Sequence, residues 1–274
     1  MVHYLVWILT ASLYATIIYV LYRSKWMASD YTHAYFILPI FFWLVWRKHT
    51  SLREHLKKIK PDNNFLGLFI FLMGILMYIF GKRQNYLFIT TLSLLPVLSG
   101  LIHYLYGLSI TRILSFPIFY LILIVPLPLA IVDSITLPMR YGITIATEVI
   151  LRLFDYPITR EGLLLSIGSN ELFMGQPCSG FRSLITMFSL ALVYVYLSKT
   201  SLPKKTLLVS LIIPLSLFGN LIRVIALCII TYYFGEAAGQ GFFHNFSGIV
   251  IFMIILSGLI GLECLFKKNL YLTN

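Results

Sequence analysis

The sequence predicts an all-α polytopic membrane protein, and two features of its composition carry that prediction. Of its 274 residues, 59% are hydrophobic and only 11% are charged, which is too apolar for a water-soluble domain of this length. Several apolar stretches also reach the roughly 20 residues that a helix needs to cross a hydrocarbon layer about 30 Å thick. No polar stretch is long enough for a second, soluble domain, so we expect residues 1–274 to form a single integral membrane domain.

About eight transmembrane helices are expected, of which the second is short for a full crossing. They run about 4–22, 34–46, 65–80, 86–106, 113–132, 178–197, 206–234 and 244–266. No small-residue cleavage site follows the first segment, so we interpret it as a retained helix. Pro126 and Pro128 should kink or end the fifth segment, because proline lacks the backbone N–H that a helix needs.

The region between the fifth and sixth segments, about residues 133–177, is the longest stretch of mixed polarity and is predicted to form a cap. Its first part, 135–154, spaces apolar residues at helical intervals, which favours a helix lying on the membrane surface. Its second part is rich in glycine and is expected to form short strands or an ordered loop, about 163–167 and 172–174.

The basic residues predict the orientation of the chain. With the N-terminus inside and eight crossings, the inner loops hold twelve basic residues and the outer loops hold seven. The inner ones are Arg47, Lys48, Arg53, Lys57, Lys58, Lys60, Arg112, Lys199, Lys204, Lys205, Lys267 and Lys268. This asymmetry obeys the positive-inside rule and makes both termini cytoplasmic and the cap extracytoplasmic. We therefore interpret the net charge of +11 as a topology signal, and expect no nucleic-acid partner.

A thiol, a guanidinium and an imidazole occur in the last three apolar segments, as Cys178, Arg223 and His244. At a helix rise of about 1.5 Å per residue, they lie roughly 30, 25 and 33 Å from the inner ends of their segments. All three are therefore expected near the outer edge of a hydrocarbon core roughly 30 Å thick. Consecutive antiparallel helices with short connections are usually neighbours, so these residues are expected to meet.

Together the three residues fit a thiol-based acyl-transfer site. A thiolate is the nucleophilic form of cysteine, and a nearby cation such as Arg223 stabilises it or the oxyanion of a tetrahedral intermediate. His244 is placed to take the thiol proton and return it to a leaving amine. Asn220 lies one turn before Arg223 and is expected to orient it or a substrate carbonyl. Arg182, one turn after Cys178, is a second candidate cation.

Each of these residues also has a purely structural interpretation. A lone cysteine in an apolar helix is usually a packing residue, and a Cys178–Cys228 disulfide stays open. His244 suits a membrane interface, and Arg223 suits a buried ion pair. The three cysteines form no CxxC pattern, which argues against a zinc site or a disulfide framework. No metal or cofactor is expected.

Several motifs resemble the exosortase/archaeosortase family, and together they cover most of the chain. Cys178-Ser179-Gly180-Phe181-Arg182-Ser183 is similar to its cysteine signature, while Gly219-Asn220-x-x-Arg223 and His244-x-x-x-Gly248 resemble its arginine and histidine motifs. Val125-Pro126-Leu127-Pro128 resembles its proline-rich fifth segment. Near the N-terminus, Trp26-x-x-x-Asp30-Tyr31-Thr32-His33-Ala34 resembles its opening motif, although Thr32 and Ala34 replace the usual Ser and Gly.

The resemblance implies a membrane-embedded cysteine transpeptidase of a bacterial inner membrane, with its active site at the extracytoplasmic face. It makes Cys178 the nucleophile, Arg223 the electrostatic stabiliser and His244 the acid and base. It implies substrates with a C-terminal sorting signal: a motif such as Pro-Glu-Pro, a transmembrane helix and a basic tail. These would be cleaved through a thioester acyl-enzyme and passed to a surface or exopolysaccharide-linked acceptor. Asp30 and His33 would face outside, where they line the site or anchor the second segment.

Three other classes of protein are alternatives to a transpeptidase. An intramembrane protease would use the same residues and resolve the acyl-enzyme with water. A polysaccharide export or assembly protein without peptidase chemistry would carry charged or broken helices at the membrane midplane, whereas the charge here is expected near the outer edge. A thiol–disulfide enzyme would need a CxxC partner for Cys178, which the sequence lacks.

Overall fold

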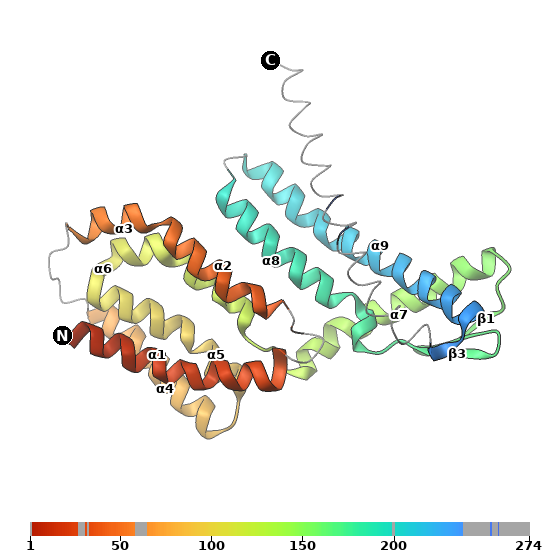
Figure 1. Ribbon diagram of the computed structural model, residues 1–274, viewed down its shortest axis with the longest axis horizontal. Coiled ribbons are helices and arrows are strands. Elements are labelled where there is room, and N and C mark those ends of the chain that lie inside the picture. The colour runs from red at the N-terminus through yellow and green to blue at the C-terminus, as the bar shows by residue number, and fades with distance from the viewer. Residues whose placement is uncertain are drawn as a thin grey trace, which may run out of the picture. The chain divides into compact units, whose positions relative to one another are not determined.

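The computed structural model describes residues 2–26, 31, 33–57, 65–198, 201–237, 253 and 257, and most of its elements are helices (Figure 1). The α-helices are α1 (Val2–Leu21), α2 (Ala34–Arg47), α3 (His49–Leu56), α4 (Phe65–Arg83), α5 (Leu87–Leu92), α6 (Leu94–Tyr120), α7 (Leu129–Leu153), α8 (Phe181–Leu197) and α9 (Leu202–Phe234). The strands are β1 (Ile158–Glu161), β2 (Leu164–Ile167) and β3 (Asn170–Phe173). The chain divides into two compact units, Met1–Pro128 and Leu129–Asn274.

Five helical stretches in the described part of the chain are long and apolar enough to cross a membrane. They are Tyr4–Ser24, Phe65–Arg83, Leu87–Ile124, Leu129–Leu153 and Leu202–Phe234. The helices α2 and α8 are apolar but shorter. The predicted helical membrane architecture is therefore confirmed in outline, whereas the count of eight crossings and the single domain stay predictions. Apart from Met253 and Ser257, the eighth segment lies outside the described residues.

In the N-terminal unit, α4 packs closely against α5 and α6 through a row of glycines. Gly67, Gly74 and Gly81 recur every seven residues along α4, and all three are buried. A methyl group added at Gly74 would lie 2.7 Å from the backbone nitrogen of Val97 on α6. Small residues at such a contact let two membrane helices approach until their backbones touch.

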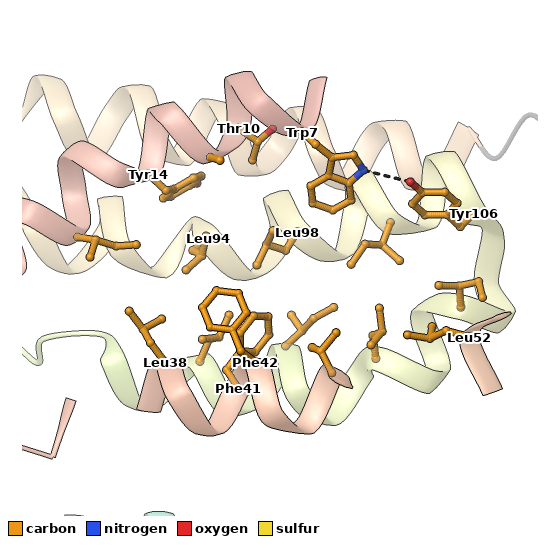
Figure 2. A pocket seen from close by; sticks show the side chains of 18 of the residues that line it. Trp7, Thr10, Tyr14, Leu38, Phe41, Phe42, Leu52, Leu94, Leu98 and Tyr106 are labelled. Atoms are coloured by element: carbon orange, nitrogen blue, oxygen red, sulfur yellow. Dashed lines mark hydrogen bonds between the residues drawn. The ribbon is translucent and has the colours of Figure 1, made fainter. Parts of the chain in front are cut away.

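The helix α6 is broken at Gly107, whose backbone (φ 78°, ψ 176°) is not helical. This break separates the predicted fourth and fifth segments, and the second half returns beside the first (Figure 2). The short 3₁₀ helix η3 (Leu121–Ile124) then ends before Pro126, as predicted. The predicted extension of the fifth segment to Val132 is wrong: α7 begins at Leu129, because the prolines stop one helix and the chain behind Pro128 starts another.

An apolar cavity of about 580 Å³ lies among α1, α2, α3 and α6 (Figure 2). Trp7 of α1 and Phe41 and Phe42 of α2 line it from opposite sides. At one end, the indole N–H of Trp7 donates a hydrogen bond to the Tyr106 hydroxyl, at 3.2 Å. The basic stretch after Arg47, which the sequence analysis treated as an inner loop, forms α3 here, and its Leu52 reaches the cavity.

In the C-terminal unit, the three strands form an antiparallel sheet in the order β1-β2-β3. Leu165 of β2 pairs with Leu172 of β3, and both side chains are buried in one core with Val224 and Leu227 of α9. The structure contains strands at both places where the sequence predicts them. It also contains β1, which the sequence analysis missed because Ile158-Thr159-Arg160-Glu161 holds a single apolar residue.

The helix α7 is amphipathic with its polar side turned inward. Its buried face carries Thr136, Arg140, Ile143, Thr144, Thr147 and Leu151. Its exposed face carries Ile131, Ile135, Leu137, Tyr141, Ile145, Val149 and Leu153. An apolar outer face and polar groups inside are typical of a helix in contact with lipid. The prediction that α7 lies along the surface stays a prediction, since its length and composition also permit a crossing.

Candidate active site

The sheet leads the chain directly to Cys178. Met174, at the end of β3, is fully buried, and its backbone N–H donates to the Leu163 carbonyl at 2.9 Å. Four residues later, the N–H of Cys178 donates to the Gly175 carbonyl at 3.0 Å and closes the 3₁₀ helix η4 (Gln176–Ser179). The Cys178 side chain is enclosed, with the residue only 6% exposed. The prediction that Cys178 opens the sixth helix is wrong, because α8 begins at Phe181.

Gly180 produces the turn between Cys178 and α8. Its backbone is left-handed (φ 75°, ψ 0°), a conformation that glycine adopts without steric penalty. A methyl group at this position would also lie 2.7 Å from the side-chain amide carbon of Asn220. On the far side of the turn, the Ser183 hydroxyl donates to the Gly180 carbonyl at 2.8 Å. The turn therefore requires glycine both for its backbone conformation and for its contact with α9.

Asn220 of α9 fixes the position of the cysteine. Its amide nitrogen donates to the backbone carbonyl of Cys178 at 2.8 Å, and the residue is only 2% exposed. A buried carbonyl without a partner is costly, so this bond stabilises the attachment of η4 to α9. The structure thus gives Asn220 a contact that the sequence did not predict, while its predicted role in orienting Arg223 or a substrate carbonyl stays a prediction.

Arginine side chains from two helices act on the thiol, and a third arginine lies close to one of them. Arg223 of α9, less than one turn beyond Asn220, is close enough for its charge to act on Cys178. Arg182 of α8 lies within electrostatic range of Arg223. Arg140 of α7 also acts on Cys178. The cations thus arise from three helices, α7, α8 and α9, that pack against η4.

The cysteine lies outside the spanning helices, and its acidity reflects two opposing influences. Burial raises the pKa of the Cys178 thiol above its usual range, while the charges of Arg223 and Arg140 and the hydrogen bond with Gly175 lower it. Burial disfavours the charged thiolate more than the cations favour it. Use of this thiol as a nucleophile therefore calls for a base that removes its proton.

The remaining predicted site residues lie in the other unit or outside the described residues. His33 is buried at the start of α2 in the N-terminal unit, with its ring 5.8 Å from that of Tyr31. Asp30 and His244 lie outside the described residues. Cys178 and Cys228 are both buried and neither is in a disulfide, so the Cys178–Cys228 disulfide left open by the sequence is not formed.

Arg140 is the residue that the sequence analysis missed. It was counted only as one basic residue of the cap. The signal was present, because Thr136, Arg140, Thr144 and Thr147 recur every three or four residues and therefore share one face of a helix. Among the described residues, no group of three or more His, Cys, Asp or Glu is placed to hold a metal ion.

The helices, their apolar outer faces and the enclosed cysteine define a multi-pass membrane protein with a polar site inside its C-terminal unit. Comparison with protein families matches residues 26–261 to the transmembrane exosortase family (Exosortase_EpsH). The chain belongs to this family, since the match covers most of its length. Neither the curated proteins nor the solved structures gave a match.

Proposed function

We propose that this protein is a cysteine transpeptidase that cleaves the C-terminal sorting signal of membrane-anchored proteins and transfers them to an acceptor nucleophile. The observation that carries the proposal is the setting of Cys178: an enclosed thiol, fixed through its own carbonyl by Asn220, beside the cation Arg223. A structural cysteine needs neither a backbone clamp nor a neighbouring charge. Membership of the exosortase family supports the same chemistry.

In the proposed first step, His244 takes the proton from the Cys178 sulfur, and the thiolate attacks the carbonyl carbon of the scissile peptide bond. The carbonyl oxygen becomes an oxyanion, which Arg223 stabilises. When the tetrahedral intermediate collapses, the C–N bond breaks and His244 returns the proton to the leaving amine. The substrate is left as a thioester on Cys178.

In the second step, an acceptor amine or hydroxyl loses its proton to His244 and attacks the thioester carbon. The C–S bond breaks, the Cys178 thiol is re-formed with that proton, and the substrate leaves joined to its acceptor. Water in place of the acceptor would make the protein a protease. The residues required are the same in both cases, so the mass of the product distinguishes transfer from hydrolysis.

The proposed topology places both termini in the cytoplasm and the site at the extracytoplasmic face of the bacterial inner membrane. The sorting signal of a membrane-anchored substrate lies just outside the bilayer, at the depth expected for Cys178. We further propose that the cap, residues 133–177, helps recognise that signal. Unchanged substrate choice and turnover after substitutions on the exposed cap surface would contradict the role of the cap.

The test is the processing of a tagged candidate substrate co-expressed with wild-type protein, Cys178→Ala or Cys228→Ala. Cys228 is the matched control, since it is also a buried, free thiol of the same core. We expect processing with wild type and Cys228→Ala, none with Cys178→Ala, and a product carrying added mass. Processing by Cys178→Ala, inserted at wild-type level, would rule out the thiol mechanism.

A further inference from the structure

Arg140 is a buried arginine close to Cys178 that has no role in the reaction steps proposed above. Arg140 lies in the middle of α7 and is only 7% exposed. An arginine inside a membrane protein is expensive to bury and is retained where it has a partner or a task. The helix α7 packs against η4, which carries Cys178, and Ile143 of α7 shares a core with that cysteine.

The ion pair of Arg140 is longer than those of Arg152 and Arg160, two arginines of the same unit that are less buried. Its guanidinium lies 3.3 Å from Asp133, a half-exposed carboxylate, and its Nε lies 3.4 Å from the Thr136 carbonyl. By contrast, Glu148 holds Arg152 at 2.9 Å and Arg160 at 3.0 Å. Charge-assisted hydrogen bonds usually measure about 2.7–2.9 Å. The most buried of these three arginines therefore has the longest contact with a carboxylate.

The charged groups around the thiol are dominated by cations. Arg140 of α7 and Arg223 of α9 act on the thiol itself. Arg182 of α8 acts on Arg223, Asp133 of α7 pairs with Arg140, and Cys228 lies nearby on α9. One carboxylate thus accompanies three guanidinium groups among the described residues. Because Asp133 is half exposed, solvent screens it more than it screens Arg140.

We propose that Arg140 is a second electrostatic residue of the Cys178 site: its guanidinium, only partly neutralised by Asp133, stabilises the negative charge that forms on the sulfur. Arg140 acts on the thiolate, whereas Arg223 is placed to act on the thiolate and the substrate oxyanion. Two cations on separate helices lower the cost of forming a thiolate in a buried site. The role of this charge in turnover rests on the proposed function, but the stabilisation of the thiolate does not.

The experiment measures the alkylation rate of Cys178 by iodoacetamide against pH, in full-length protein carrying Cys228→Ala and Cys264→Ala. The Cys178 sulfur forms a bond to the acetamide carbon, iodide leaves, and the thiol proton passes to the buffer. We expect Arg140→Gln to move the midpoint of the profile upward by about one pH unit, which slows alkylation about tenfold at pH values below the midpoint. Arg140→Lys keeps the charge and should keep the midpoint near that of the parent protein.

Two further variants distinguish this role from a structural one. Arg152→Gln removes a charge from the exposed side of α7 and should leave the midpoint unchanged. Asp133→Asn removes the carboxylate beside Arg140 and should lower the midpoint. If Arg140→Gln changes only the maximal alkylation rate reached at high pH and leaves the midpoint unchanged, Arg140 serves packing alone and the proposal is overturned. If that variant does not fold, Asp133→Asn decides: a lowered midpoint supports the proposal and an unchanged one overturns it.

The alkylation result is independent of the substrate. If Arg140→Gln leaves the midpoint of the alkylation profile unchanged, Arg140 has no electrostatic role at Cys178, and the transpeptidase proposal is unaffected. Conversely, substrate processing by Cys178→Ala would remove the transpeptidase proposal, while a shifted midpoint would still show that Arg140 acts on the thiol. The two proposals therefore fail separately.

Discussion

The N-terminal and C-terminal units both bury polar side chains, but they satisfy them differently. In the N-terminal unit, the hydroxyls of Thr10, Thr90 and Thr91 donate to carbonyls of their own helices. In the C-terminal unit, Thr144 and Ser189 do the same. Four other buried hydroxyls there, those of Thr136, Thr147, Ser216 and Thr231, have no hydrogen-bond partner among the described residues, whereas in the N-terminal unit the indole N–H of Trp26 has none. Buried polar groups are nearly always hydrogen-bonded, so such a concentration needs an explanation.

The two interiors also differ in charge. The N-terminal unit encloses an apolar cavity lined by side chains such as Trp7, Phe41 and Leu98 (Figure 2). The C-terminal unit encloses Arg140 and the thiol of Cys178, with Arg223 half buried beside them. The contrast indicates that the first unit is built for packing within lipid, while the second keeps polar groups inside for a task.

The largest expected effect comes from removing the charge of Arg223. Arg223→Gln should slow substrate processing by about 100- to 1,000-fold, because an oxyanion then forms without its stabilising cation. The control is Arg112→Gln, which removes an exposed arginine of the N-terminal unit. Processing by Arg223→Gln at the rate of the control would break the contrast between the units. Quantitative immunoblotting of the cleaved substrate, at matched membrane levels of each variant, measures the difference.

Gly180→Ala tests the turn that presents the cysteine. The left-handed backbone makes alanine cost about 1–3 kcal/mol of unfolding free energy, and the new methyl group would also collide with Asn220. Gly162→Ala is a matched control: its φ is also positive, at +60°, but its methyl group would meet only the Tyr141 hydroxyl, at 3.8 Å. Thermal unfolding in detergent should show a larger loss for Gly180→Ala, and equal losses would contradict a tight contact with α9.

Asn220→Ala tests the clamp on Cys178. It leaves the buried carbonyl of Cys178 unpaired, which should cost about 1–3 kcal/mol of stability. Because η4 is then free to move away from α9, the rate of substrate processing should fall by more than the loss of folded protein explains. The comparison is made at a temperature where the variant is folded, as judged by size-exclusion chromatography. Wild-type turnover there would show that the clamp has no part in catalysis.

The smallest effect is expected in the N-terminal unit. Tyr106→Phe removes the acceptor of the Trp7 hydrogen bond and should cost about 0.5–1.5 kcal/mol of stability. It should leave substrate processing and the alkylation of Cys178 unchanged, because both depend on the C-terminal unit. A change in the pH profile of alkylation would show that the two units are coupled and would weaken the contrast drawn above.

The sequence predicts those parts of the fold that depend on long apolar runs and on prolines. The helices near 4–22, 34–46 and 65–80 and the end of the fifth segment before Pro126 all follow from such signals. It fails where a few residues decide the structure. The start of α8 at Phe181 depends on the left-handed Gly180, and β1 is held by Arg152, whose Nε donates to the Ile158 carbonyl at 3.2 Å.

The candidate site was predicted through residues whose chemistry is unusual in an apolar chain. Cys178, Arg223 and Asn220 are of this kind, and the structure brings their helices together. Arg140 escaped because the cap contains other arginines, and the pairing of Arg152 and Arg160 with Glu148 cannot be read from their positions alone. Burial is a property of the folded chain, and it is what separates Arg140 from the other two.

The central claim is that Cys178 carries the substrate as a thioester. The most direct measurement is acid quenching of the protein during turnover of a candidate substrate, followed by mass analysis of the peptide that contains Cys178. We expect that peptide to carry the substrate's acyl fragment and to lose it on treatment with neutral hydroxylamine, which cleaves thioesters. The contradicting result is an unmodified Cys178 peptide from a reaction that is still forming product when it is quenched. Product formation must also require no other thiol of this chain.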